Sequence, residues 1–533
     1  MKKGKLRITS AILSAIVAMS VFASCGQNGS NNTGGPSPTS SPTSSGPSDS
    51  QGTPAIPADY TIEILTISHE GNIIAENHPN FQTLKEHTGY NVKLQYVLNA
   101  NYDEQMNTRL ASGDLPGLIV ITGNTGPIVS AAKAGAFWDI TEKYKDYPNL
   151  AKANENVMRN ISIEGRIYGI YRARTIGRNG ISYRSDWLQN LGLEEPKTLE
   201  DLYNVLHAFT YDDPDGNNKN DTYGMTWSTY MGPFNNLAVM HGAPNMWGID
   251  ENGKLYPWFE SDAYIETLDY SKRLYDDGLI NRDFAALQSG EWANDFGTGK
   301  SGLWIDVADQ ANRHAIKLKD NGFITQEQVD DGSVVWVMGS VANSKGEIYS
   351  LPTPGHAGYV AISRTGAKTE EDLYHHLNFM DKCNDEIGQN ILNYGTEGIT
   401  YDKSPEGFVI SLEKEEIVAR AGAGMDSSAG WNQFMMNTTD LLYKKEGNPR
   451  ITRQEEVYQE NLPNTVHNPA LSLVSDTYTA KGKSLEQIIQ DATINYIMGK
   501  IDLNGFKVEV QRWYSEGGQD ALNEYQSAYD QTK

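Results

Sequence analysis

The chain has 533 residues, which is too long for one hydrophobic core and predicts two or three lobes. Its 68 acidic and 44 basic side chains give a formal net charge of −24. This balance disfavours nucleic acid as a partner, because phosphates require basic surfaces. It also argues against a polyanionic ligand, unless one local basic patch reverses the balance.

Residues 1–24 have the pattern of an export signal. A basic start precedes an apolar run from Ile8 to Ala23, which is too short for an ordinary membrane-spanning helix. The next residue, Cys25, ends a stretch that resembles a lipobox, so we expect lipidation there; a plain signal peptide is the alternative. Residues 25–58 are rich in Gly, Ser, Pro, Thr and Asn, which predicts a disordered tether. With Cys25 acylated, Cys383 has no disulfide partner and is expected to be a packed, inert thiol.

From Tyr60 onward, strand and helix patterns alternate. We expect strands at 60–67 and 91–97, a helix at 102–112 and a third strand before Thr122. This order predicts an α/β fold with helices on both faces of a sheet. Ligands in such folds bind beyond the carboxyl ends of strands, which makes Asn124 a candidate ligand contact.

The stretch from Tyr183 to Gly224 predicts two helices. Ser185 can cap the first, and Thr198 with Asp201 has the capping-box spacing for the second. Four apolar residues of the second helix recur at helical spacing and predict a buried face: Leu199, Leu202, Leu206 and Phe209.

The loop after this helix has oxygen-bearing groups at alternate positions, as calcium requires. The predicted ligands are Asp213, Asp215, Asn217, the Lys219 carbonyl, Asp221 and, in place of a missing glutamate, Thr222 or water. Asn218 stands where a glycine is usual, and Gly224 occupies the glutamate position. A solvated, Asx-rich turn is the alternative.

These helices and this loop resemble the extracellular solute-binding lipoproteins that feed ABC importers, in the oligosaccharide-binding branch. The resemblance runs roughly from Tyr60 to Tyr525. The two stretches that match the family most specifically are Tyr183–Gly224 and Tyr394–Tyr401. It implies two lobes, each a mixed β-sheet flanked by helices, joined by hinge crossovers. Lobe 1 would contain 59–176 plus about 359–420, and lobe 2 would contain 177–358 plus about 421–533. Some members of this branch bind calcium in the corresponding loop.

The resemblance also implies a function: capture of an oligosaccharide and its delivery to an ABC permease, without catalysis. The protein would be a monomer, held by the Cys25 lipid on the outer face of the cell membrane. The first crossover would carry Arg178 and Asn179, which either touch the ligand or stabilise the hinge by hydrogen bonds.

Further ligand contacts are expected where the chain returns to the cleft. Sugar rings stack on aromatic side chains, and polar groups bind their hydroxyls. The aromatic-rich stretch from Met225 to Trp258 supplies two candidates, although packing in a core is the alternative for each. The candidates are Trp227, Trp247, Trp304, Asp306, Tyr359, Glu397 and Trp431.

Two other functions stay open at this point. One is an exported glycan-active hydrolase, which would need paired carboxylates such as Asp306 and Glu397. Their spacing gives no support, and the chain has no GxSxG elbow. The other is a peptide-binding or sensory lipoprotein of the same fold, because fold does not determine the ligand.

Overall fold

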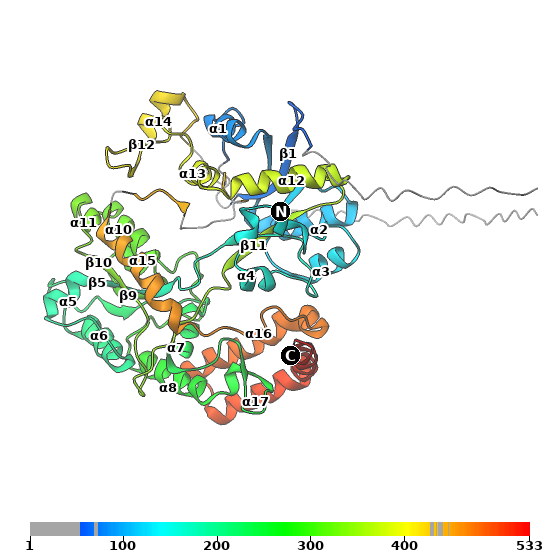
Figure 1. Cartoon of the computed structure of the whole chain (residues 1–533). Coiled ribbons are helices and arrows are strands. Elements are labelled where there is room, and N and C mark those ends of the chain that lie inside the picture. The colour runs from blue at the N-terminus through cyan, green and yellow to red at the C-terminus, as the bar shows by residue number, and fades with distance from the viewer. Residues whose placement is uncertain are drawn as a thin grey trace, which may run out of the picture. The chain divides into compact units, whose positions relative to one another are not determined.

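The structure is a computed structural model that describes residues 54–68, 73–426, 431–432, 434, 441–445 and 447–532. The predicted signal peptide, the Cys25 lipidation site and most of the predicted tether lie outside these residues. The described chain forms two lobes, each built on its own sheet, as predicted (Figure 1).

Lobe 1 contains a five-stranded sheet with the order β2-β1-β3-β11-β4. β1 pairs in parallel with β2 and β3, whereas β11 is antiparallel to β3 and β4. The sheet is therefore mixed. Its strands are β1 (Thr61–Ser68), β2 (Asn91–Leu98), β3 (Leu118–Ile121), β4 (Gly169–Ala173) and β11 (His356–Ile362).

The helices of lobe 1 pack on this sheet through one continuous apolar core. They are α1 (Pro79–Thr88), α2 (Tyr102–Ser112), α3 (Gly126–Lys133), α4 (Glu155–Asn160), α12 (Glu370–Cys383) and α13 (Glu386–Tyr394). A further helix, α14 (Lys414–Ala421), has no buried residue and lies outside this core. α1, α12 and α13 lie side by side (Figure 1). A capping box of Thr369 and Asp372 starts α12, and the buried Cys383 ends it. A small hairpin, β12 (Tyr401–Lys403) and β13 (Val409–Ser411), follows α13.

Lobe 2 contains a four-stranded sheet with the order β10-β5-β9-β6. Its strands are β5 (Asn179–Arg184), β6 (Tyr223–Met225), β9 (Ser301–Val307) and β10 (Val335–Met338). Successive side chains of a strand point to opposite faces. In β9, Leu303 and Ile305 enter one core, while Trp304 between them enters another. Both faces of this sheet are therefore covered.

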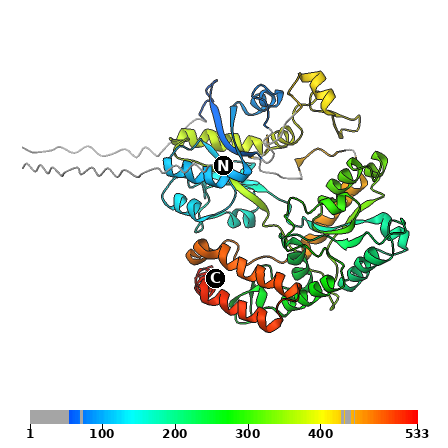
Figure 2. The ribbon, with the colours of Figure 1, turned by 180° about the vertical axis from the view of Figure 1, so that it is seen from behind.

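The helices of lobe 2 come from two separate parts of the chain. They are α5 (Ser185–Leu191), α6 (Leu199–Tyr211), α7 (Gly232–His241), α8 (Asp262–Asp276), α9 (Asn294–Gly297), α10 (Gln310–Asp320), α11 (Gln326–Asp330), α15 (Pro449–Asn461), α16 (Asp476–Ile497), α17 (Leu503–Trp513) and α18 (Gln519–Asp530). α16, α17 and α18 pack together at one end of the lobe (Figure 2). A hairpin of β7 (Trp247–Ile249) and β8 (Leu255–Pro257) completes the lobe.

The predicted cap of α6 is confirmed, and the predicted cap of α5 is wrong. Thr198 and Asp201 form the capping box, and all four residues of the predicted apolar face are buried. Ser185 makes no capping hydrogen bond; its hydroxyl donates to the Ser333 carbonyl. The Ser475 side chain caps α16 by accepting from the Tyr478 N–H.

Three segments cross between the lobes. The third crossing lies further along the chain than the expected boundary near residue 420. Trp431 and Phe434 lie in the core of lobe 1, and the Asn390 side chain bonds the backbone of Leu441 and Tyr443. Lobe 1 therefore continues to about residue 443. Lobe 2 resumes at α15, where the buried Arg450 donates to the Val329 and Val335 carbonyls. The other two crossings are 174–178 and 339–355.

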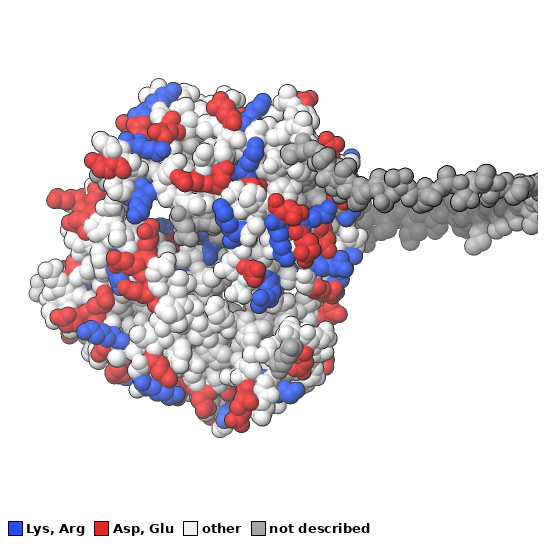
Figure 3. All heavy atoms as spheres, in the orientation of Figure 1, with Lys and Arg blue, Asp and Glu red and all other residues white. Residues whose placement is uncertain are grey.

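None of the described helices is long and apolar enough to cross a membrane. Acidic and basic side chains are interspersed over the face of the protein seen in Figure 3.

Candidate functional site

The strand ends of the two sheets meet at the first crossing. β4 ends at Ala173, and β5 starts at Asn179 after only five residues. Because Asn179 pairs with Val307, the carboxyl end of β9 adjoins the carboxyl end of β4. This interlobe cleft is where the predicted binding site should lie.

Arg178 and Asn179 both make hinge contacts in this structure. The Arg178 guanidinium binds Asp309 through two hydrogen bonds of 2.9 Å, and Arg313 contacts the same carboxylate at 2.7 Å. Burial alone raises the pKa of Asp309, but the two arginines outweigh it and hold this pKa below its ordinary value. The Asn179 amide donates to the Leu351 carbonyl of the second crossing, at 2.9 Å. Of the two predicted roles, hinge stabilisation is the one that these contacts perform.

Asn124 and Tyr359 form a pair on the lobe 1 side. The Tyr359 hydroxyl donates to the Asn124 side-chain oxygen at 3.0 Å, while the Asn124 amide donates to the Ile161 and Ser162 carbonyls. Tyr359 is only 1% exposed, so its role is to orient Asn124. Asn124 lines a cavity of about 330 Å³ whose opposite wall comes from lobe 2, including Ser475 and Tyr478.

Three of the predicted stacking tryptophans belong to hydrophobic cores, so the expectation that they face a ligand is corrected. Trp227 is 0% exposed and packs edge-on against Phe284. Trp304 lies within β9 and stacks on Trp292 with ring centroids 3.6 Å apart. Trp431 is buried in lobe 1 and packs against Phe81. In this conformation, none of these three rings has a face free for a sugar.

Trp247 is also a core residue, 5% exposed and packed against Trp513 and Tyr525, but it lines a cavity of about 290 Å³ within lobe 2. Aromatic side chains dominate the wall of this cavity, which we call the aromatic cavity. It is lined by Tyr230, Phe234, Trp247, Trp258, Phe259, Tyr264, Tyr478 and Trp513, among others. Asn235, Glu486 and Gln490 add polar groups. Large apolar surfaces with a few polar groups are typical of sites that bind sugar rings.

Asp306 and Tyr230 lie at the edge of lobe 2 next to the cleft. The Tyr230 ring is 48% exposed, and its hydroxyl is 3.5 Å from the Asp306 carboxylate. Burial raises the pKa of Asp306 to about 6. The sequence did not single out Tyr230, although it belongs to the aromatic-rich stretch that follows β6. Its position between the aromatic cavity and the cleft makes it the best-placed stacking residue.

Glu397 lies in lobe 1 between α13 and β12, where it forms an ion pair of 2.9 Å with Lys403. Its other neighbours belong to the same hairpin region, including Tyr401.

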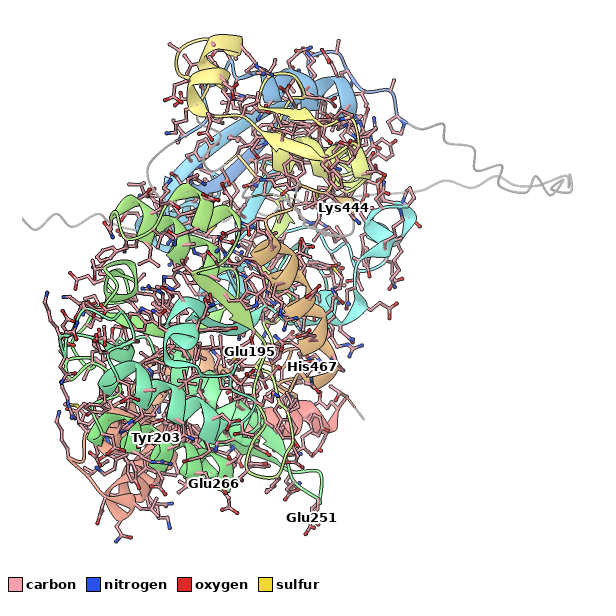
Figure 4. All side chains as sticks on the ribbon, turned by 90° about the vertical axis from the view of Figure 1, so that its left-hand side faces the viewer. Glu195, Tyr203, Glu251, Glu266, Lys444 and His467 are labelled. Carbon is pink, nitrogen blue, oxygen red and sulfur yellow. The ribbon has the colours of Figure 1, made fainter. Side chains whose placement is uncertain are left out.

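Lys444, labelled in Figure 4, lies on the segment that leads from this region to α15. Of the acidic residues labelled there, Glu251 and Glu266 lie on the outer side of lobe 2 (Figure 4).

The predicted calcium loop has its carboxylates around one side chain. The Asn217 amide donates to Asp215 at 2.8 Å and to Asp221 at 3.2 Å, while its backbone N–H donates to Asp213. Burial raises the pKa of Asp215, and the charges of Asp221 and Asp213 add to this effect.

Two other positions of this loop bear on the calcium prediction. Asn218 adopts the left-handed conformation (φ 59°) of the usual glycine. The Thr222 hydroxyl donates to the Phe209 carbonyl at 2.9 Å, which leaves the lone pairs of its oxygen for a cation, so Thr222 stays a predicted ligand. Among the described residues, no three His, Cys, Asp or Glu side chains form a ready-made metal site.

The comparisons with known proteins agree with this architecture. The pattern of the bacterial extracellular solute-binding protein family matches residues 73–355. Lipoprotein LipO of Bacillus subtilis is 35% identical over 480 residues, which cover 89% of this chain and 93% of LipO. The polygalacturonan/rhamnogalacturonan-binding protein YtcQ of the same organism is 33% identical, over 84% of this chain and 87% of YtcQ. The chain therefore belongs to the bacterial extracellular solute-binding protein family.

Solved structures show the same fold. The substrate-binding protein FusA of S. pneumoniae, in complex with kestose, superimposes with a TM-score of 0.64. The two sequences are 19% identical, and the match covers 89% of this chain and 99% of FusA.

Proposed function

We propose that the chain captures an oligosaccharide in its interlobe cleft and delivers it to an ABC permease. The aromatic cavity beside the cleft carries this proposal, because it offers ring faces together with a few polar groups. Two relatives support it: YtcQ is named for binding polygalacturonan and rhamnogalacturonan, and FusA was solved with kestose.

In this mechanism the two lobes close around the sugar. Asn124 from lobe 1 and Tyr478 from lobe 2 face the same cavity, so a ligand there contacts both lobes. A ligand that binds both lobes stabilises the closed state relative to the open one. The three crossings absorb the rotation, and the permease then receives the closed complex.

The proposal includes the location of the protein. Lipidation of Cys25 would hold the chain, as a monomer, on the outer face of the cell membrane, with residues 25–58 as a tether. The name of the lipoprotein relative LipO supports this part. Metabolic labelling with a fatty acid tests it, because Cys25→Ser should abolish the label.

A calcium ion in the loop between α6 and β6 is a further part of the proposal. Asp213, Asp215 and Asp221 would hold it, with the Asn217 side chain turned to present its oxygen. These oxygen groups suit a hard cation. Its contribution would be structural, because it would neutralise three carboxylates that now cluster around Asn217.

A thermal-shift screen tests the binding function. We would use the chain from Cys25 onward, with Cys25→Ser, against plant and microbial oligosaccharides. One glycan class should raise the melting temperature by about 5 °C or more at a concentration about 100 times Kd. Sugar analysis of the same samples should show no shortened product. Product formation that requires Asp306 or Glu397 would favour a glycan-active hydrolase. Binding of peptides alone would favour a peptide-binding or sensory lipoprotein of the same fold.

A further inference from the structure

The first crossing is rich in arginine. Arg172 lies in β4, one residue before its end, Arg174 directly follows the strand, and Arg178 directly precedes β5, so three arginines lie within seven residues at the first crossing. The whole chain carries a net charge of −24, so this basic segment departs from the general composition.

Two of these arginines have protein partners. Arg178 is bound to Asp309, and Arg172 is buried and donates to the Ala357 carbonyl at 2.8 Å. The Arg174 side chain is exposed and makes no hydrogen bond or ion pair with any residue in the described part of the chain. Its backbone is fixed, because its N–H donates to the Gly355 carbonyl at 3.0 Å. Arg174 therefore presents a free guanidinium from a fixed backbone position.

The electrostatic surroundings leave Arg174 without a counterion. Partial burial lowers the pKa of its guanidinium, and the nearby Arg178 and Arg313 lower it further. Asp309 acts in the opposite direction, but its carboxylate is already bound by Arg178 and Arg313. An anion bound at Arg174 would relieve this repulsion.

We propose that Arg174 binds a carboxylate of the ligand, and that the oligosaccharide therefore contains uronic acid. This inference rests on the proposed oligosaccharide-binding function. A guanidinium group matches a carboxylate with two parallel hydrogen bonds, which makes arginine the preferred partner for such groups. A uronic acid ring offers both a carboxylate and an apolar face, and the exposed Tyr230 ring lies at the cleft edge of lobe 2. The name of the relative YtcQ is consistent, since polygalacturonan is a polymer of a uronic acid.

The experiment compares an acidic oligosaccharide with its neutral counterpart. Galacturonate oligosaccharides and the same compounds with their carboxyl groups reduced to alcohols would be titrated calorimetrically into the Cys25→Ser chain. We expect the acidic form to bind at least about 10-fold more tightly than the reduced form. Arg174→Gln should weaken the acidic form by about 10-fold to 100-fold and leave the reduced form unchanged, because a charge-assisted hydrogen bond is lost.

Controls separate this loss from general effects. Arg512→Gln removes the same charge from the exposed surface of α17 and should not change either affinity. The melting temperature of unliganded Arg174→Gln should not fall below that of the parent, because among the described residues Arg174 makes no side-chain hydrogen bond or ion pair to lose, and its repulsion by Arg178 and Arg313 is removed. Arg174→Lys, which keeps the charge, should retain part of the affinity.

Each remaining outcome has a defined meaning. Equal binding of the acidic and reduced forms, or an unchanged affinity in Arg174→Gln, would overturn the inference but keep the oligosaccharide function. Tight binding of sulfated oligosaccharides without binding of uronates would also overturn it, since the anion would then be a sulfate ester. Failure of every oligosaccharide to bind would overturn both proposals.

Discussion

His314 shows how a single residue ties stability to pH. Its ring lies in α10, stacked on Phe296 with centroids 4.0 Å apart and edge-on to Trp304 at 4.7 Å. Neither ring nitrogen has a hydrogen-bond partner among the described residues. Burial lowers the pKa of this imidazole well below its ordinary value of 6.5, so it is neutral in the folded protein.

We expect His314→Phe to reduce the loss of stability on acidification. Below pH 6.5 the unfolded chain binds a proton at His314 that the folded chain rejects, so folded stability falls as the pH falls. One such histidine contributes up to about 1.4 kcal/mol per pH unit. The slope of the unfolding free energy between pH 6.5 and pH 4.5 should decrease by about that amount, as measured by denaturant titration. Phenylalanine suits the site because its neighbours are aromatic.

The control for this prediction is His467→Gln, at the exposed residue labelled in Figure 4. Its slope should equal that of the parent, because the ring is solvated in both states. If His314→Phe keeps the parent slope as well, His314 is not the source of the acid sensitivity.

At the scale of helices and strands, periodic patterns predicted much of the fold. The expected strands at 60–67 and 91–97 and the helix at 102–112 match β1, β2 and α2 to within one residue at each end. These patterns succeed because each of these elements has its own period and its own termination signal.

The same patterns could not identify which side chains face the cleft. The alternation of side chains along β9 shows that Trp304 points to the opposite face of the sheet from Leu303 and Ile305. The sequence does not reveal that helices cover both faces of that sheet. Asn124 was found because strand ends have a known role in ligand binding. Arg174 was not found, because its lack of a partner depends on Asp309, which is distant in sequence and already bound by Arg178.

The loop between α6 and β6 is the element whose stability should depend on calcium. Three carboxylates lie around Asn217, and a cation would remove their repulsion. Chelator should lower the melting temperature of the parent by several degrees, and added calcium should restore it. In Asp213→Ala/Asp215→Ala, chelator should have no effect. Differential scanning calorimetry measures both.

The hairpin between β7 and β8 supplies a matched control. Asp250 accepts hydrogen bonds from the Asn252 and Lys254 N–H groups and so forms an Asx-rich turn without a cluster of carboxylates. Asp250→Ala should leave the response to chelator intact. If the parent shows no response either, the loop between α6 and β6 is a solvated turn and the calcium proposal fails.

At the scale of the whole molecule, Asn461 joins the first two crossings to α15. It ends α15, the helix that follows the third crossing, and is 2% exposed. Its amide donates to the Gly177 and Asn179 carbonyls of the first crossing, at 3.0 and 2.6 Å. Its oxygen accepts from the Ser350 hydroxyl of the second crossing at 3.1 Å. A side chain at Gly177 would collide with α15, since its Cβ would lie 2.3 Å from the Tyr458 carbonyl oxygen.

Asn461→Ala should therefore destabilise the first and second crossings together. The Gly177 and Asn179 carbonyls lose a donor, and the Ser350 hydroxyl and the Ser340 N–H lose an acceptor, so we expect the free energy of unfolding to fall by about 3 kcal/mol. Hydrogen exchange should rise together in 174–180 and 339–351, because both segments depend on the same amide. Asn464→Ala, whose amide bonds only the Glu460 carbonyl within its own helical end, should change stability by less than about 1 kcal/mol and leave exchange at the crossings unchanged. Faster exchange in only one of the two segments would show that the crossings move independently and that Asn461 does not couple them.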